Sequence, residues 1–525
     1  MSSWMTVAIA SGSSLLLHLF LLVILYLTPS PLVDEVADEG GIEDAVAQKL
    51  EEKKEDFFED VGDPDRDLAA NDPMPSNDNV AAPVMENEPV GVAAEATPVM
   101  NESSIPPPPG VNSNTFAGLQ ADAAGDLGGG VLNTGGLSGA LAVGGIAGRS
   151  GGGKKAALTM GGGSEISEAS VARGLRWLAN HQLPDGSWAM DAHVLPNGRP
   201  CGCNKAGKRD SRVGGTAFGL LPMLAAGITH KPNSEKIEEK EDSGKGGKAA
   251  YHAQVQKGLN YLMAKQDKRT GAFSSEPYSH SLAAIAMCEA AGMTSDPLLR
   301  ASAQKAIAYV IDFQDPSGGG WRYSPKQPGD TSVTGWMFMA LKSAQMAGLR
   351  VAPERYKLVE RFLDSVLDTK TGYYGYEKAG GASPAMTAVG MLCRLYLGTR
   401  PSNENLRKGG EFLKKNPPAS QYNMYYLYYA TQTMHHMGAQ NDCWDTWNLG
   451  PNRNGKGGIR DFLIEKQIGG PKSPPNATHM RGSWDPAGGF ADEGGRLMMT
   501  SLALLSLEVY YRHLPLYMSE AGAAR

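Results

Sequence analysis

Apolar and polar residues alternate at helical spacing through the C-terminal two-thirds of the chain, in two kinds of segment that take turns. One kind carries Lys, Arg and Glu along one face, as in residues 255–265, which is typical of a helix with one side in water. The other kind is mainly Ala, Met, Leu and Ser, whose small side chains let helices pack closely. The pattern predicts about six helix pairs. The two helices of the first pair begin near residues 164 and 216. The other five pairs are 255–265 with 280–292, 303–313 with 331–348, 356–368 with 383–398, 404–415 with 422–437, and 459–467 with 494–514.

A turn motif recurs between the partner helices. Gln182 is followed by Gly186 and Trp188, and degraded copies begin at Gln266, Gln314 and Gln467. The Gln amide can join two helix ends, the Gly allows a positive backbone angle, and the aromatic ring buries a large area. Such a period of paired helices indicates a repeat architecture, and we expect the motifs to hold repeats together rather than to contact substrate. Neither terminal pair is polar enough to cap an open array. The predicted fold is therefore all-α, an α/α toroid.

These motifs resemble the repeats of the squalene cyclase and prenyltransferase superfamily over about residues 164–517. The resemblance implies a terpenoid cyclase-like toroid whose active site lies at the mouth of an inner helix. The family's cyclases protonate their substrate with the middle Asp of an Asp-rich motif, but the best counterpart, residues 327–332, keeps only the last acid, Asp330. The family's prenyltransferases hold zinc with an Asp, a Cys two residues later and a His, and Ser332 stands where that Cys is needed.

The resemblance therefore implies a member in which the family's catalysis is lost, with Asp330 as the one remaining catalytic candidate. A single Asp before Thr331 also fits a simpler role as the N-cap of the helix that follows.

The N-terminal third differs in composition from the repeats. Residues 5–27 are uncharged and largely apolar, long enough to span a bilayer, and lack the features of a cleaved signal peptide. We predict a transmembrane anchor at residues 1–30, then a disordered tether at 31–163 that is charged and later rich in Pro, Ala and Gly. The toroid domain, residues 164–525, is expected on the extracytoplasmic (periplasmic) side of the membrane, in a single-pass protein.

Charge and cysteine usage narrow the possible chemistry. The formal net charge of -7 gives no basic footprint, so nucleic acid is not a predicted partner. The five Cys are scattered and form no disulfide framework. Cys201 and Cys203 lie near His193 and Asp210 and could take part in a metal site or form a strained redox pair, but zinc ligands are usually spaced more widely. We predict no cofactor and no metal, with Cys201 and Cys203 as the weak metal candidates.

Aromatic and charged residues of the inner segments are the candidate ligand-binding residues. If several faced the toroid axis they would line a hollow for an apolar ligand, although each could equally be ordinary core. The set comprises Trp336, Tyr425, Tyr428, His435, Trp444 and Trp484, with Asp485 and Arg496 for a polar ligand end.

The expected function is that of a membrane-anchored toroid that binds an apolar, isoprenoid-like ligand or a protein partner at its mouth. The alternative is a terpenoid cyclase or prenyltransferase-type enzyme with a rearranged acid, Asp330, and with Asp485 or His280 as further candidates. An enzyme acting on envelope polysaccharide is a third hypothesis, which rests on fold analogy alone.

Overall fold

The structure is a computed structural model, and it describes Arg149 and residues 151–193, 199, 201–240, 246–438, 440–454, 456–470 and 479–513. The predicted anchor, residues 1–30, lies outside these residues, as does most of the predicted tether. The expected membrane contact is corrected for the described residues, in which no helix is both long and apolar enough to cross a bilayer.

The structured part begins earlier than the predicted boundary at residue 164. Helix α4 (Gly151–Gly161) lies inside the segment predicted as a tether and packs on α18 (Val509–Arg512). The contact is close, because a Cβ added at Gly161 would lie 2.6 Å from the ring of Tyr510. A helix of low amphipathicity was not visible in the Gly-rich sequence, and its partner lies more than 300 residues further along the chain.

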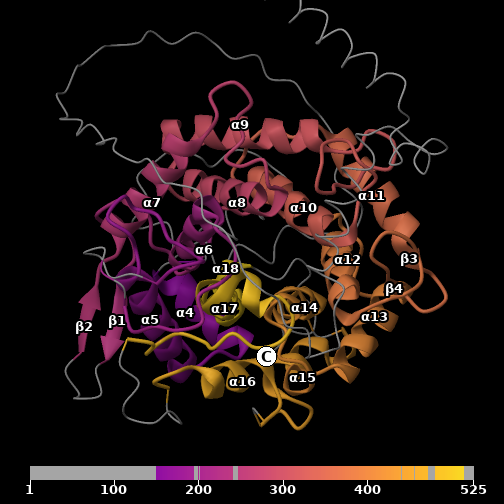
Figure 1. The fold of residues 1–525 in the computed structure, drawn as a ribbon. Helices are drawn as coiled ribbons and strands as arrows, with labels where there is room; N and C mark the ends of the chain where they lie inside the picture. Colours follow the sequence, from indigo (N-terminus) through magenta and orange to yellow (C-terminus); the bar gives the residue numbers. More distant parts are fainter. Residues whose placement is uncertain are drawn as a thin grey trace, which may run out of the picture. The chain divides into compact units, whose positions relative to one another are not determined.

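Six of the described helices form a closed inner ring (Figure 1). Each packs against the next in chain order, and the last packs on both the fifth and the first. The ring consists of α6 (Arg212–Ala225), α8 (Pro277–Thr294), α10 (Thr331–Met346), α12 (Pro384–Tyr396), α14 (Met424–Met437) and α17 (Ala491–Leu507). This closure confirms the predicted α/α toroid.

An outer helix precedes each inner one in the chain. These helices are α5 (Glu165–Asn180), α7 (His252–Lys265), α9 (Pro297–Phe313), α11 (Pro353–Val366), α13 (Glu404–Lys415) and α16 (Ile459–Lys466). They are buried along one face only. In α11, for example, Val359, Phe362, Leu363 and Val366 are buried, while the charged residues between them face water. Helix α16 packs against α5, so the outer row also closes.

The connections hold small elements that the helical pattern did not predict. Two antiparallel hairpins are formed by β1 (Ile237–Lys240) with β2 (Gly246–Ala249) and by β3 (Leu367–Asp368) with β4 (Tyr373–Tyr374). Helix α15 (Cys443–Leu449) and the short 3₁₀ turns η2 (Pro418–Ser420) and η3 (Gln440–Asp442) lie around the fifth and sixth pairs.

The recurring turn motif joins successive repeats, as expected from its residues. The Gln314 side chain ends α9 and donates hydrogen bonds to the carbonyl oxygens of Gly319 (2.8 Å) and Arg355 (3.3 Å), the latter in the next outer helix. Gly319 has a φ of +89°, and a Cβ there would lie 2.0 Å from the carbonyl oxygen of Leu358. Trp321 donates its indole N–H to the Val310 carbonyl at 2.8 Å. The motif is thus a structural joint.

The inner helices all start at one end of the ring. Each is separated from the next by an antiparallel outer helix, so successive inner helices run in the same direction. Side-chain contacts agree: the hydroxyl of Tyr278, at the start of α8, lies 3.0 Å from that of Ser332, at the start of α10. The Lys208 amide, just before α6, donates to the Asp492 carbonyl at the start of α17. We call this end the N-terminal mouth.

Candidate metal centre

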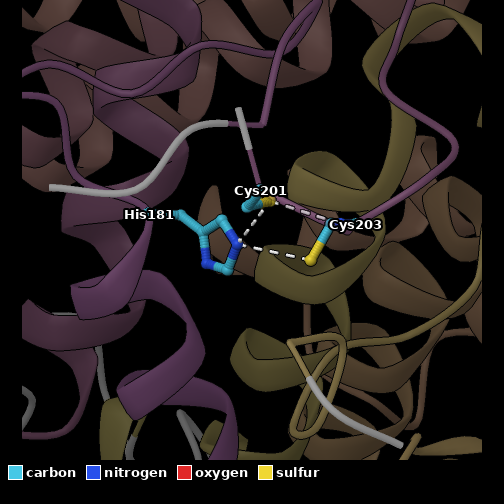
Figure 2. Close-up of side chains that lie close together, drawn as sticks. All are labelled: His181, Cys201 and Cys203. Atoms are coloured by element: carbon cyan, nitrogen blue, oxygen red, sulfur yellow. Dashed lines mark hydrogen bonds between the residues drawn. The ribbon is translucent and has the colours of Figure 1, made fainter. Parts of the chain in front are cut away.

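Three side chains with metal-ligating atoms meet beside the N-terminal mouth (Figure 2). His181 ends α5, and Cys201 and Cys203 lie in the connection that leads to α6. The His181 Nε2 atom is 3.4 Å from the Sγ of Cys201 and 3.3 Å from the Sγ of Cys203. Each residue offers one ligand atom, and the three atoms lie within 4.8 Å of one another.

The ring of His181 is held in the orientation that a metal ligand requires. Its Nδ1 lies 2.6 Å from the carbonyl oxygen of Trp177, one turn earlier in α5. A carbonyl only accepts, so Nδ1 carries the proton and Nε2 presents its lone pair to the two sulfurs. Metal-binding histidines are usually fixed in this way by a backbone carbonyl or carboxylate. The ring also stacks on Trp177, with centroids 4.2 Å apart. Burial lowers the pKa of His181 to about 4, which keeps it neutral at pH 7.

The separations between the ligand atoms are compatible with a zinc ion. Zn–S bonds of about 2.3 Å and Zn–N bonds of about 2.0 Å at a tetrahedral angle put sulfur and nitrogen about 3.5 Å apart. The two distances in the protein are 3.4 and 3.3 Å, so an ion requires only a small outward shift. Without metal, burial raises the pKa of Cys203 to about 12, which leaves a thiol at pH 7. Metal binding would displace that proton, as it does at other thiolate sites.

A buried arginine fixes the cysteine-bearing loop. Arg496 of α17 is fully buried and donates to the Asn204 carbonyl (3.0 Å), to the Asn204 side chain (2.7 Å) and to Asp485 (2.5 Å). Its amide donates to the Lys205 carbonyl. Its positive charge also opposes the rise in the pKa of Cys203, although burial has the larger effect. Asp485 and Arg496, predicted to bind a polar ligand end, thus lie next to the cluster and position its loop.

The same loop approaches α17 so closely that glycine is required on both sides. Gly495 has a φ of +59°, and a Cβ there would lie 2.1 Å from the amide nitrogen of Gly207. A Cβ on Gly207 would lie 2.4 Å from the Glu493 carbonyl oxygen. The chain just after Cys203 is therefore held against α17, which restricts the position of the two cysteines.

His193 stands at the edge of the cluster. Its ring packs edge-on against His181 and Trp177, with centroid distances of 6.0 and 5.7 Å. Its Nε2 is buried and has no hydrogen-bond partner within the described part of the chain. His193 does not belong to the group whose ligand atoms lie within 4.8 Å of one another.

Asp330 lies at the start of α10, as predicted, and is fully buried. Its Oδ1 accepts hydrogen bonds from the Val333 amide (2.8 Å) and the Ser332 hydroxyl (2.7 Å), which is the geometry of an N-cap. Burial raises its pKa to about 6, against the effect of these two donors. Its catalytic role remains a prediction, and with no solvent exposure the carboxyl does not meet a substrate directly in this conformation.

The predicted aromatic residues are brought together, but against one another. Trp336 of α10 stacks on Tyr428 of α14 across the ring, with centroids 5.4 Å apart and planes 12° from parallel. Tyr425 packs on Tyr429, which in turn contacts Trp336 edge-on. These rings, which the sequence predicted to line a hollow, thus pack against one another. Such close packing of large rings is favourable in itself.

The remaining predicted aromatics are joints between elements. Trp444 donates its indole N–H to the Gly161 carbonyl at the end of α4 (2.8 Å) and packs edge-on against His435. Trp484 donates to the Leu463 carbonyl of α16 at 2.8 Å. Both rings are buried. They connect the last repeat and α4 to the toroid.

His181 is the candidate metal ligand that the sequence did not single out. It directly precedes Gln182 of the best-preserved turn motif, so its place at a helix end could have been inferred. Its distance of 20 residues from Cys201 along the chain gives no recognisable zinc spacing. Only the fold brings the three ligand atoms together.

Neither a protein-family model nor a curated protein matches the chain. Several solved structures are similar to it. The α-1,6-mannanase GH76A of Salegentibacter sp. HEL1_6 has 10% identity and a TM-score of 0.43, covering 65% of this chain and 98% of that one. An inactive variant of that enzyme in complex with α-1,6-mannotetrose has 9% identity and the same TM-score of 0.43, covering 66% and 98%. An α-amylase from Clostridium perfringens has 9% identity and a TM-score of 0.42, covering 65% and 98%.

These findings correct two expectations. The squalene cyclase and prenyltransferase assignment has no family-level support, and what the chain shares with that superfamily is the general α/α-toroid architecture. The expected isoprenoid-like ligand is corrected as well, because the aromatic side chains expected to line its hollow, such as Trp336 and Tyr428, stack on one another.

Proposed function

We propose that the protein binds one zinc ion through His181, Cys201 and Cys203 and uses it at the N-terminal mouth as a Lewis acid toward an oxygen-bearing ligand. The observation that carries this proposal is the convergence of the three ligand atoms within 4.8 Å, with Nε2 of His181 presented by its bond to Trp177. Two thiolates and a neutral imidazole suit zinc in both softness and geometry.

The number of ligands favours a reactive site over a purely structural one. Structural zinc sites normally have four protein ligands, whereas catalytic sites have three and leave the fourth position to water or substrate. In the described part of the chain the group has three members, and both cysteines are partly exposed, so a small ligand can reach the metal from solvent. Zinc held by these residues would supply a bound water that ionises near neutral pH, and Arg496 lies close enough for its charge to act on His181 and His193.

The first test is the metal content of the full-length protein, purified under reducing conditions without chelator. We expect about one zinc per chain, and Cys203→Ser and His181→Gln each to weaken zinc binding by about 100-fold or more, since each removes a direct ligand. Cys443→Ala is the matched control, because this buried thiol lies in α15, outside the cluster. Equal zinc content in all four proteins would contradict the proposal.

A second measurement separates a reactive site from a structural one. Cobalt replaces zinc in such sites and gives visible bands that report its coordination. We expect added azide to change these bands in the wild type, because it enters the fourth position. A spectrum that azide does not change, with one cobalt still bound per chain, would show that the fourth position is closed and would contradict the Lewis-acid role. If the His193→Gln protein then did respond to azide, His193 would be identified as the fourth ligand.

A further inference from the structure

A second polar site lies at the opposite end of the ring from the metal cluster. A small cavity is lined by residues near the C-terminal ends of α8, α10 and α12, together with Arg149, Arg512 and His513. Its volume is about 10 Å³, close to the minimum that holds one water-sized particle. Cationic side chains dominate the lining, which includes Arg149, Lys342 and Arg512 and a single carboxylate, Glu289.

The two arginines share that carboxylate. Arg149 donates to one oxygen of Glu289 at 2.7 Å, and Arg512 donates to the other at 2.9 Å. Both guanidinium groups and the carboxylate are buried. Burial alone would raise the pKa of Glu289, yet the two arginines lower it below its usual value, so it is ionised. Two positive charges against one negative charge leave an excess positive charge inside the protein.

A further buried acid, Glu508, is not hydrogen-bonded to either arginine. Glu508 is fully buried, and neither of its carboxylate oxygens has a hydrogen-bond partner among the described residues. Burial raises its pKa well above the usual value, which favours the neutral acid. A buried charge without a counter-charge costs several kcal/mol, so the site favours an external anion.

Hydrogen-bond donors are available for such an anion. The Nε atoms of Arg149 and Arg512 and the Nε2 atom of His513 are buried and make no hydrogen bond within the described residues. All three residues line the cavity. Lys342 lies in the same wall, and burial lowers its pKa to about 8, so it is still largely charged at pH 7.

We propose that this cavity binds a small monovalent anion of halide size. The small volume excludes anions such as sulfate or gluconate and requires the walls to move slightly outward for chloride or bromide, and the unpaired Nε–H groups of Arg149 and Arg512 replace part of the anion's hydration shell. The anion balances the positive charges of Arg149 and Arg512 and so helps to hold α8, α18 and the segment at Arg149 together. The site is independent of the metal cluster at the N-terminal mouth.

The test is thermal unfolding of the full-length protein in sodium chloride, sodium bromide or sodium gluconate at equal ionic strength. We expect a saturable rise in Tm of about 2 °C or more with chloride and bromide and little with gluconate, because only the small anions enter the cavity. Identical curves in the three salts would overturn the proposal.

Two variants connect the effect to this site. Lys342→Gln removes a cation from the wall and should raise the half-saturating chloride concentration about fivefold or more, whereas Lys154→Gln, a change of equal charge on α4 outside the lining, should leave it unchanged. Glu508→Gln should also leave it unchanged, because Glu508 is already neutral. A wild type insensitive to chloride beside a Glu508→Gln protein that responds strongly would identify Glu508 as the internal counter-charge and overturn the anion site.

Discussion

At the scale of single residues, Asp330 caps a helix, which is favourable, although its carboxylate is buried, which is unfavourable. Its carboxylate caps α10 through the Val333 amide, which is a stabilising role for an Asp. It is nevertheless fully buried, and its second oxygen, Oδ2, has no hydrogen-bond partner among the described residues. The sequence predicted the cap from the residue type and its position before Thr331. It could not predict the burial, which depends on loops from neighbouring repeats, such as the Tyr376 carbonyl that accepts from the Thr331 amide.

The pH dependence of Asp330→Asn follows from this burial. The folded-state pKa of about 6 exceeds the unfolded value of 3.8, so ionised Asp330 destabilises the fold, and this penalty disappears as the pH falls through 6 toward 4. We expect Asp330→Asn to be more stable than the wild type at pH 7.5 by up to about 3 kcal/mol, with the difference shrinking toward pH 4, in urea unfolding at each pH. Asp296→Asn, at the N-cap of α9, is the control, because its pKa is lowered and its loss should destabilise at pH 7.5. Lower stability of Asp330→Asn at both pH values would contradict this account.

At the scale of elements, the inner helix α6 depends on glycine where it meets the motif tryptophan Trp188. In α6, a Cβ at Gly219 would lie 2.3 Å from the Trp188 ring, and one at Gly215 would lie 2.3 Å from the Trp188 carbonyl oxygen. The Trp188 ring cannot retreat easily, because it is buried and its indole N–H is bonded to the Leu178 carbonyl. The small-residue composition of the inner segments predicted close packing. The particular partner of each glycine became known only from the structure.

Gly219→Ala tests which effect dominates at this contact. Intrinsic helix propensity favours Ala by about 1 kcal/mol, whereas forcing a methyl group into a packed core usually costs about 1–3 kcal/mol. An approach of 2.3 Å to a pinned ring places this site at the upper end, so we expect a net loss of about 2 kcal/mol in unfolding free energy. Gly247→Ala in β2 is the control, since nothing lies within 4 Å of its new Cβ. A more stable Gly219→Ala protein would mean that propensity outweighs the overlap.

At the scale of the whole molecule, stability depends on a seam between the first and last repeats. Helix α17 packs on α6, α16 packs on α5, and the Gln467 side chain donates to the Ser170 carbonyl in α5 at 2.8 Å. In an open array the terminal repeats have one neighbour and are the weakest units. In this ring every repeat has two neighbours, so no repeat is terminal.

Closure therefore predicts equal costs for equal core deletions around the ring. Leu497 of α17 lies at the seam, 3.5 Å from the position of a Cβ on Gly215 of α6, and Leu341 of α10 lies well inside the row of repeats. Both are buried. We expect Leu497→Ala and Leu341→Ala each to lower the unfolding free energy by about 2–5 kcal/mol, measured by urea unfolding. A cost at Leu497 far below that at Leu341 would indicate that the seam opens in solution.

The sequence by itself determined the helix pairs, the joints between them and the toroid, because apolar periodicity and the Gln, Gly and Trp of each turn are local signals. The predicted second helix of the third pair, 331–348, differs from α10 only at its end. Tertiary structure alone decided the two sites. Arg149 meets Glu289 and Arg512 through contacts between distant segments, whereas His181 meets Cys201 and Cys203 through the path of the connection between α5 and α6. Tertiary structure also placed Trp336 against Tyr428, because the direction of an inner side chain depends on the helices opposite and not on its own neighbours in sequence.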